Sequence, residues 1–395
     1  MNIAVMTPTY LPIVGGAEVG IFEIYRRLSH HHRVTIYTPE LPGRESYHSG
    51  EEPYFVDERL NIVRYHDRLR WSALPNRMVP LMNALTYNHS VGAFETARSL
   101  PMETDVVNCH YFFQNFGAIR CLVGRGLPVV VSVIGREFDK MPRFTPSWLY
   151  ARAVFARCAA VIYISNYMQT VVGIRGRNEH VVPYGVDTGR YAPGLPNRQL
   201  LENHGVPPGA KVIFTVQRLS RVKRIDILLD AFAVVLKKMP SALLLIGGTG
   251  GDMLRLKKHA VSIAISGSVR WCGYIPETHL PEYYRLADVV AFHSLNETFG
   301  VVIPQAFASG KPLVTIRCTA LQEVVQDGET GLLAAPGDPV DLADKIYVLL
   351  EDRGRASSLG NTAAAYSRQY FSWDTIADRY ESVLTSVSAR GIHGV

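Results

Sequence analysis

Short runs of apolar, mostly β-branched residues alternate along the chain with segments whose apolar residues recur every three or four positions. In the first half such runs lie at 2–7, 34–38, 105–109, 129–133, 161–164 and 180–182. Runs that are apolar at every position are typical of parallel strands buried on both faces, and the three-and-four spacing is typical of helices. The order strand, glycine loop, helix, strand at the start of the chain predicts a βαβ unit.

A second series of the same kind follows. Its predicted strands are 212–216, 243–246, 289–292 and 313–315, and its predicted helices are 225–238, 278–286, 301–309 and 340–351. Glycine and proline interrupt the stretch 184–197, which we interpret as an interdomain connection. We therefore expect two doubly wound, Rossmann-like α/β domains, 1–190 and 198–370. Ligands of such sheets lie beyond the carboxyl ends of the strands, which predicts a site in the cleft where two sheets face each other.

Composition narrows the class of protein. The chain has 395 residues, of which 47% are hydrophobic, and its five cysteines are scattered, as expected for reduced thiols. It has no apolar run of roughly 18 residues, as a membrane-spanning helix would need, and it starts without a signal sequence, so we expect a cytoplasmic protein. The net charge of +6 suits an anionic ligand or a membrane surface better than sequence-specific binding of nucleic acid.

Two glycine-rich loops follow predicted strands. Gly15 and Gly16 open the first predicted helix, where free backbone N–H groups and the positive helix end favour an anion. The spacing does not match the dinucleotide fingerprint GxGxxG, and a tight turn without a ligand explains the glycines equally well. Gly248, in the run 247–251, allows the same two interpretations.

Cations and a carboxylate follow two strands of the second series. Arg218 and Lys223 lie between the strand 212–216 and the helix 225–238, where they could bind a diphosphate; the alternative is a solvated basic loop. Glu297 follows the strand 289–292 and could accept hydrogen bonds from sugar hydroxyls, although an isolated loop glutamate is normally solvated. Gln305, in the next helix, could face the same cleft.

Eight segments in the same order resemble the motifs of GT-B fold glycosyltransferases of family 4, a retaining group that uses nucleotide sugars. Among them, VVVSVIGREFD resembles "TxHGxD/E", VVPYGVDTGRYAP resembles "vipNGvDxxxF", VQRLSRVKRIDILLDAF resembles "vGRLxxxKGxdxLixAf", and SLNETFGVVIPQAFASGKPLV resembles "ExFGxxxxEAxAxGxPV". The glycine loop PIVGGAE and the closing segments match in their places. The resemblance covers nearly the whole chain.

The resemblance implies a role for each matching position. Arg218 and Lys223 would clamp the donor diphosphate, and Glu297 would bind hydroxyls of the transferred sugar. The turn 299–301, formed by Phe299, Gly300 and Val301, would approach the donor with its backbone N–H groups, and Gly16 would lie near the phosphates. The helix from 373 to about 391 would cross back to the N-terminal domain, which would select the acceptor. UDP is the favoured nucleotide, with retention of configuration.

Three positions depart from the family pattern. Gln305 stands where a glutamate is expected to bind the ribose hydroxyls, and Ile134 stands where a histidine is thought to contact the donor sugar. The glycines of "GGxPE" appear as Thr319 and Ala320. Ile134 and Glu137 would lie on the acceptor and sugar side. His110, at the end of the strand 105–109, is our candidate to replace the missing histidine, the alternative being a histidine that bonds only to its neighbours.

The chain has no Asp-x-Asp pair, so we expect neither a metal nor another cofactor. A phosphorylase of the same fold and a catalytically weak sugar-nucleotide-binding protein are the rival functions. The acceptor, a small molecule, a glycan or a lipid-linked group, cannot be recognised in 47–88. The basic, aromatic stretch there (Arg59, Arg64, Arg68, Arg70 and Trp71) could touch a membrane, although we slightly favour a solvated surface.

Overall fold

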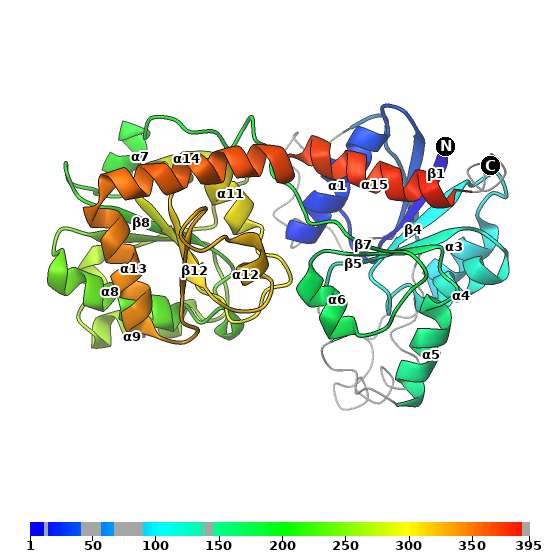
Figure 1. The fold of residues 1–395 in the computed structure, drawn as a ribbon, viewed down its shortest axis with the longest axis horizontal. Coiled ribbons are helices and arrows are strands. Elements are labelled where there is room, and N and C mark those ends of the chain that lie inside the picture. The colour runs from blue at the N-terminus through cyan, green and yellow to red at the C-terminus, as the bar shows by residue number, and fades with distance from the viewer. Residues whose placement is uncertain (12–14, 41–56, 67–89, 136, 139–144, 389–395) are drawn as a thin grey trace. The chain divides into compact units, whose positions relative to one another are not determined.

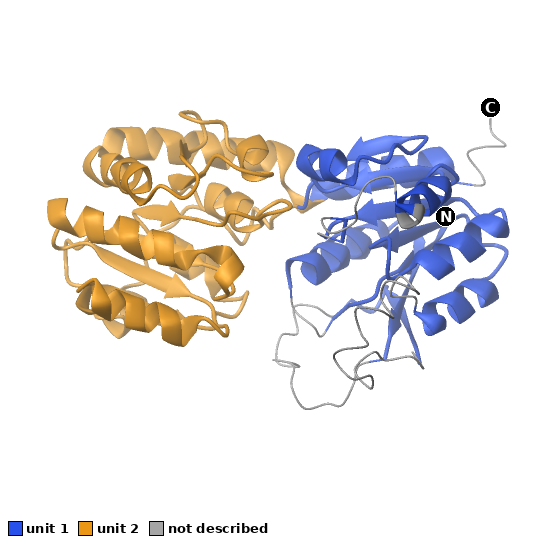
Figure 2. Ribbon diagram, turned by 90° about the horizontal axis from the view of Figure 1, so that it is seen from below, with its two compact units in different colours: residues 1–184, 374–395 blue, residues 185–373 orange. Residues whose placement is uncertain are grey.

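The computed structural model describes residues 1–11, 15–40, 57–66, 90–135, 137–138 and 145–388. The chain divides into two compact units (Figure 2). Unit 1 comprises Met1–Tyr184 and Asp374–Val395, and unit 2 comprises Gly185–Trp373. The change from one unit to the other falls within the glycine- and proline-rich stretch 184–197.

Unit 1 is built on a seven-stranded parallel sheet with the strand order β3-β2-β1-β4-β5-β6-β7. Figure 1 labels β1, β4, β5 and β7 of this sheet. Its strands are β1 (Asn2–Met6), β2 (Arg33–Pro39), β3 (Asn61–Tyr65), β4 (Val106–His110), β5 (Val129–Val133), β6 (Ala160–Tyr163) and β7 (Glu179–Val181). The central strands β4, β5 and β6 are buried at every position, as their uninterrupted apolar sequences predict.

Side chains cap the first turn of three helices in unit 1. Ser90, Thr145 and Ser165 each accept a hydrogen bond from the backbone N–H three residues later, which satisfies a donor that the first turn leaves free. The described helices are α1 (Gly16–Leu28), α3 (Val91–Ser99), α4 (Phe116–Gly124), α5 (Pro146–Phe155), α6 (Asn166–Val172) and α15 (Trp373–Val387).

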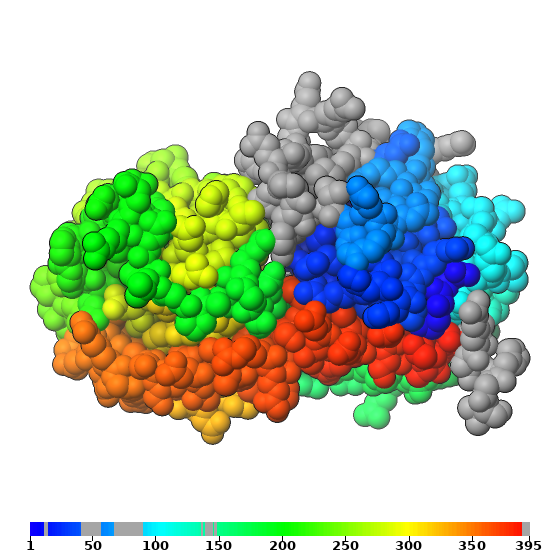
Figure 3. All heavy atoms as spheres, turned by 90° about the horizontal axis from the view of Figure 1, so that it is seen from above, coloured from blue at the N-terminus to red at the C-terminus, as the bar shows by residue number. Residues whose placement is uncertain are grey.

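The last helix of the chain packs on unit 1. In Figures 1 and 3, α15 (red) lies beside the N-terminal elements, and Asp374 and Glu381 on α15 bond to Arg27 and His32. Ile376, Tyr380 and Leu384 of α15 are buried. The helix therefore covers the sheet of unit 1 with an apolar stripe and fixes itself with polar contacts along its edge.

Unit 2 contains a six-stranded parallel sheet with the order β10-β9-β8-β11-β12-β13. Its strands are β8 (Val212–Val216), β9 (Leu243–Gly247), β10 (Val269–Gly273), β11 (Val289–Ala291), β12 (Leu313–Ile316) and β13 (Leu332–Ala334). Its helices are α7 (Arg198–Asn203), η3 (Arg221–Lys223), α8 (Ile225–Lys238), α9 (Met253–Ser262), η4 (Ser266–Ser268), α10 (Leu280–Leu286), α11 (Val302–Ala308), α12 (Leu321–Val324), α13 (Pro339–Glu351) and α14 (Arg353–Tyr370).

Two parallel, doubly wound sheets confirm the predicted fold class, and both show the Rossmann-like order in which the first strand lies next to the fourth. The sequence did not single out β3, β10 or β13, each of which lies at or next to the margin of its sheet. None of the helices within the described residues is both long and apolar enough to cross a membrane.

Candidate functional site

The strand order of unit 2 selects one place for a ligand. β8 pairs with β9 on one side and with β11 on the other, so the connections that leave these neighbouring strands run in opposite directions. In open parallel sheets this arrangement leaves a crevice at the carboxyl ends of the two strands. In unit 2 the crevice is bordered by the segments 217–224 and 292–301.

Two predicted site residues meet there. Lys223 Nζ donates a hydrogen bond to Glu297 Oε1, and both side chains are mostly buried. The single turn η3 holds Lys223, whose backbone N–H bonds to the carbonyl oxygen of Ser220 at 2.9 Å. The backbone N–H of Glu297 lies 3.4 Å from the hydroxyl of Thr319. A cation and a carboxylate from two neighbouring strand ends are thus already in contact.

Arg218, the second predicted cation, lies on the same segment as Lys223. Its side chain is exposed and makes no hydrogen bond or ion pair with the described residues. The next residue, Leu219, anchors the segment, because its backbone N–H bonds to the carbonyl oxygen of Thr249 at 2.8 Å. Arg218 is therefore a solvent-facing cation on a fixed loop, a position that fits both interpretations made from the sequence.

Gly248, in the loop after β9, lies directly against the loop that carries Arg218. Its φ of +111° is strained for any residue with a side chain, and an added Cβ would lie 2.0 Å from the carbonyl oxygen of Gln217. This contact gives the glycine a packing role, because the loop after β9 must lie directly against the loop after β8. The predicted role of Gly248 in contacting the donor stays a prediction.

Buried polar atoms without partners gather at the same strand ends. They include Gln217 Oε1 and Ser220 Oγ after β8, and Ser294 Oγ and Asn296 Oδ1 after β11. His293 adds both of its ring nitrogens, and its side chain is completely buried. Buried polar atoms are nearly always hydrogen-bonded in folded proteins, so such a group calls for water or a ligand.

His293 was not found from the sequence, although it directly precedes the motif that contains Glu297. Burial, reinforced by the charge of Arg224, lowers the pKa of His293 to about 4. The ring is therefore neutral near pH 7 and can donate one hydrogen bond and accept another. A polar residue directly after a fully buried strand was the signal that could have identified it.

Gln305 belongs to a closed network of hydrogen bonds in unit 2. Its Oε1 accepts from Tyr284, at 2.9 Å, and its Nε2 donates to the Tyr191 hydroxyl, at 3.1 Å. Tyr191 in turn donates to Glu277 at 2.5 Å. Through this network Gln305 is connected to the carboxylate of Glu277, which the sequence did not indicate. Its predicted contact with ribose is not tested by this arrangement.

The turn 299–301 leads into α11. Phe299 is buried against Phe371, with ring centroids 5.8 Å apart, and Gly300 has a φ of +86°. The left-handed conformation of Gly300 turns the chain directly before α11, and Val301 stands at the first position of the helix start without a side-chain hydrogen bond. The turn is thus fixed by an aromatic anchor on one side and by a glycine on the other.

In unit 1 the expected anion position beside Gly15 and Gly16 holds a carboxylate of the chain itself. Glu18 lies in the first turn of α1 and accepts a hydrogen bond from the Thr9 hydroxyl at 2.6 Å. Its Oε2 lies 2.5 Å from the place of a Cβ on Gly15. The positive end of α1 is thus partly neutralised by Glu18. Residues 12–14 of the same loop lie outside the described residues.

His110 lies in the core of unit 1. Its ring is completely buried, its Nε2 lies 2.9 Å from the Tyr25 hydroxyl, and burial lowers its pKa to about 3. Tyr25 donates to Asn108, and the His110 ring stacks on Tyr380 with centroids 6.4 Å apart. The ring is thus enclosed in unit 1 and its Nδ1 has no hydrogen-bond partner among the described residues, and the catalytic role predicted for His110 stays a prediction.

Ile134 and Glu137 follow β5. Ile134 is buried, and Glu137 accepts hydrogen bonds from the backbone N–H groups of Phe112 and Phe113 at 2.8 and 2.9 Å. Burial raises the pKa of Glu137 to about 7, against the effect of these two donors. Glu137 thus joins the loops after β4 and β5, whereas its predicted place on the sugar side stays untested.

Part of the basic stretch of unit 1 lies outside the described residues, namely Arg68, Arg70 and Trp71. Most of the region 47–88, in which an acceptor motif was expected, lies outside them as well. Of its described members, Arg59 pairs with Asp57, and Arg64 donates to the carbonyl oxygen of Leu11 at 2.6 Å. These contacts are local and leave the proposed membrane contact untested.

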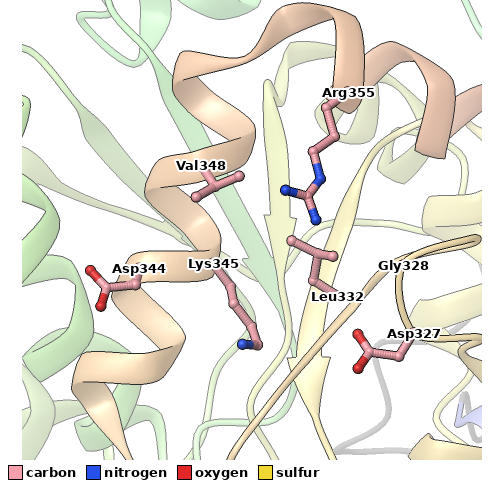
Figure 4. Close-up of a pocket in the computed structure, with 7 residues that line it drawn as sticks. All are labelled: Asp327, Gly328, Leu332, Asp344, Lys345, Val348 and Arg355. Carbon is pink, nitrogen blue, oxygen red and sulfur yellow. The ribbon is translucent and has the colours of Figure 1, made fainter.

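A separate hollow of about 420 Å³ lies in unit 2 among Asp327, Asp344, Lys345 and Arg355 (Figure 4). It borders the amino end of β13, the edge of the sheet opposite to the site. Its charges are largely matched within the protein, since Asp327 pairs with Arg317 and Lys345 with Asp341. Position and charge thus both argue against this hollow as the ligand site.

No three His, Cys, Asp or Glu side chains among the described residues come close enough together to hold a metal ion.

Comparisons with known proteins match each half of the chain to a glycosyltransferase family model. Residues 14–190 match the model of Glycosyltransferase Family 4, and residues 197–366 match that of Glycosyl transferases group 1. The chain is 28% identical to a D-inositol 3-phosphate glycosyltransferase of Corynebacterium aurimucosum, over 93% of this chain and 90% of the relative. A D-inositol 3-phosphate glycosyltransferase of Nocardia farcinica is 36% identical, over 53% of this chain and 47% of the relative.

The fold matches solved structures over nearly its full length. The structure of HepE (Alr3699) of Anabaena in complex with UDP-glucose superimposes with a TM-score of 0.75 at 21% identity, over 98% of this chain and 100% of that chain. At this identity the likeness concerns the fold alone. Because two glycosyltransferase models together match most of its length, the chain belongs to the family 4 glycosyltransferases with the GT-B fold.

Proposed function

We propose that this glycosyltransferase takes its sugar from a UDP-sugar and binds the donor diphosphate in unit 2, at the carboxyl ends of β8 and β11. The observation that carries the proposal is the contact between Lys223 and Glu297 at this crevice. The exposed Arg218 adds a cation to the same loop, and HepE, which has this fold, was solved with UDP-glucose. A diphosphate is recognised by cations of this kind.

The ion pair suggests how the site would act on the donor. The diphosphate competes with Glu297 for Lys223, because it carries more negative charge than one carboxylate. Once Lys223 contacts the phosphate oxygens, Glu297 is free to accept hydrogen bonds from hydroxyls of the transferred sugar. As the glycosidic bond breaks, negative charge grows on the leaving diphosphate, and a fixed cation lowers the barrier most where charge develops.

We further propose a phosphorylated polyol or sugar as the acceptor. The relatives named above act on D-inositol 3-phosphate, and the net charge of +6 favours an anionic substrate. Retention of configuration follows from the resemblance to family 4, in which the sugar would be attacked on the face that the leaving group departs from. Because Arg218 and Lys223 supply positive charge to the diphosphate, we propose that no metal ion is required.

Ligand binding and turnover test the proposal together. UDP and UDP-sugars should raise the melting temperature of the protein, because a ligand that binds only the folded state stabilises it, whereas GDP should have a smaller effect. Incubation with UDP-glucose or other UDP-sugars and D-inositol 3-phosphate, with and without EDTA, should release UDP in both cases. The anomeric configuration of the product, read by NMR, tests retention.

Three results would contradict the proposal. Release of a sugar phosphate from a glycoside and orthophosphate, without any need for a nucleotide, would identify a phosphorylase. Binding of UDP without turnover of any donor and acceptor pair would identify a sugar-nucleotide-binding protein. Loss of turnover in EDTA, restored by a divalent ion, would refute metal independence alone.

A further inference from the structure

Arg224 occupies a backbone conformation that does not suit it. It precedes α8 with φ +47° and ψ +46°, in the left-handed region that is unfavourable for a residue other than glycine. Thr319, whose hydroxyl lies near the backbone N–H of Glu297, has a φ of +47° as well. Strained residues of this kind gather at functional sites, so the reason for an arginine at 224 is sought in its side chain.

The side chain of Arg224 is held at one end only. Its Nε lies 3.1 and 3.3 Å from the two carboxylate oxygens of Asp226, and 43% of the side chain is exposed. The two terminal nitrogens make no hydrogen bond with the described residues. A guanidinium fixed through Nε presents these two nitrogens as a flat fork, the arrangement that matches two oxygens of a phosphate.

The local charges leave Arg224 available to an anion. Asp226 is shared with Arg255, whose Nη1 lies 3.7 Å from it, and Arg255 also pairs with Asp252. Lys223 is balanced by Glu297. The exposed Arg218 and Arg221 add positive charge to the same loop, so positive charge exceeds negative charge on the segment 218–226 and its ion-pair partners.

His293 gives a second and independent indication of a ligand beside Arg224. It is completely buried, and neither ring nitrogen has a partner. Gln217 Nε2 donates to the carbonyl oxygen of His293 at 3.4 Å, which joins His293 to the segment 217–224 that leads into α8. An imidazole enclosed in this way normally has a hydrogen-bond partner, so the polar end of the crevice is incomplete without a bound group.

We propose that Arg224 is a third cation of the donor site, which binds the diphosphate through its two terminal nitrogens together with Lys223. This inference rests on the proposed function and adds to it a residue at a position where the family motif has glycine. Binding of the anion would then offset the cost of the left-handed conformation of Arg224.

The substitution Arg224→Gly separates stability from binding. Glycine relieves the left-handed strain, and the exposed contact with Asp226 contributes little, so the melting temperature should stay the same or rise. Removal of a charged hydrogen-bonding group should weaken UDP at least about tenfold in isothermal titration calorimetry. Affinity for UMP, which lacks the second phosphate, should fall less. Asparagine tolerates the same backbone conformation, so Arg224→Asn should weaken UDP to a similar extent. The control Arg198→Ala, at an exposed arginine of α7, should bind UDP like the wild type.

The outcomes are distinct. If Arg224→Gly and Arg224→Asn keep the UDP affinity of the wild type, Arg224 does not bind the diphosphate and the inference is wrong. If the affinities for UMP and UDP fall equally, Arg224 acts on the nucleoside instead, which also overturns it. If the wild-type protein does not bind UDP at all, the proposed function is wrong. This result is distinct from a failure of the inference, because it does not depend on the variants.

Discussion

At the scale of single residues, the pair Lys223 and Glu297 has the clearest consequences. Each is mostly buried, with 19% and 12% of the side chain exposed, so neither charge is fully solvated and each is stabilised by the other. In a partly buried pair, loss of one partner leaves the other charge without compensation. Substitutions of the two residues should therefore have different effects on binding and on turnover.

Lys223→Ala should lower kcat/KM by at least about two orders of magnitude, the scale observed when one charge-stabilising group is removed. The measurement is the initial rate of UDP release at several donor concentrations. Lys237→Ala, at an exposed lysine near the end of α8, is the matched control and should keep the wild-type rate. Near wild-type turnover in Lys223→Ala would contradict the assigned role.

Glu297→Gln should lower kcat/KM by a similar factor but keep UDP affinity, or increase it. The amide no longer neutralises Lys223, which is then free to bind the diphosphate. Calorimetry with UDP gives the affinity, and Glu329→Gln, at an exposed loop position, is the control. A collapse of UDP binding in Glu297→Gln would place this residue on the nucleotide rather than on the sugar.

At the scale of elements, the sequence predicted the central strands well. β5 and β8 have the predicted bounds, because a strand that is buried on both faces has an unbroken apolar sequence. β3 (NIVRY) and β10 (VRWCG) were missed, since a strand at the margin of a sheet is partly exposed and carries charged residues. β13 is apolar but only three residues long, too short for a pattern to emerge.

The position of a side chain was predictable where it follows a central strand, as the contact between Lys223 and Glu297 shows, whereas the roles of both residues at the donor stay predictions. The burial of His110 could not be predicted, because the same rule places a side chain at the sheet edge but does not tell whether a helix covers it. Tyr380 of α15, 270 positions further along the chain, packs against its ring. Arg224 was missed because an unusual φ angle is a property of the folded chain. The place of His293 after a buried strand was a signal in the sequence, but only the fold shows that its ring nitrogens have no partners.

The glycine loop after β9 yields a prediction about an element. Gly248→Ala places a Cβ at 2.0 Å from the carbonyl oxygen of Gln217, on a backbone with φ +111°, so the loops after β8 and β9 must separate. Backbone strain of this kind costs about 1–3 kcal/mol, and urea unfolding should show at least that loss in free energy. Gly251→Ala in the same loop, where an added Cβ contacts nothing, should unfold like the wild type. Equal stabilities of the two variants would show that the loops adapt.

At the scale of the whole molecule, each unit contains a buried, neutral histidine. Burial lowers the pKa of His110 in unit 1 to about 3 and that of His293 in unit 2 to about 4, from 6.5. Below pH 6.5 the unfolded chain therefore binds protons that the native protein does not. Neither histidine affects the pH dependence of stability above about pH 6.5, and each lowers the free energy of unfolding as the pH falls from 6.5 toward its native pKa, by about 1.4 kcal/mol for each pH unit.

His110→Phe tests this pH dependence. Phenylalanine keeps the aromatic packing on Tyr380 but cannot be protonated, so the melting temperature should fall less between pH 7 and pH 5 than in the wild type. Calorimetric scans at several pH values measure the slope, and His279→Phe, at an exposed histidine, is the control. An unchanged slope in His110→Phe would mean that the His110 ring is protonated as readily in the native protein as in the unfolded chain.

The central claim is that unit 2 binds the diphosphate of a UDP-sugar at the carboxyl ends of β8 and β11. A crystal structure of the protein with UDP tests it most directly. We expect phosphate oxygens at roughly 2.7–2.9 Å from Lys223 Nζ, with Glu297 released from its ion pair. A diphosphate bound elsewhere, with the contact between Lys223 and Glu297 intact, would contradict the account.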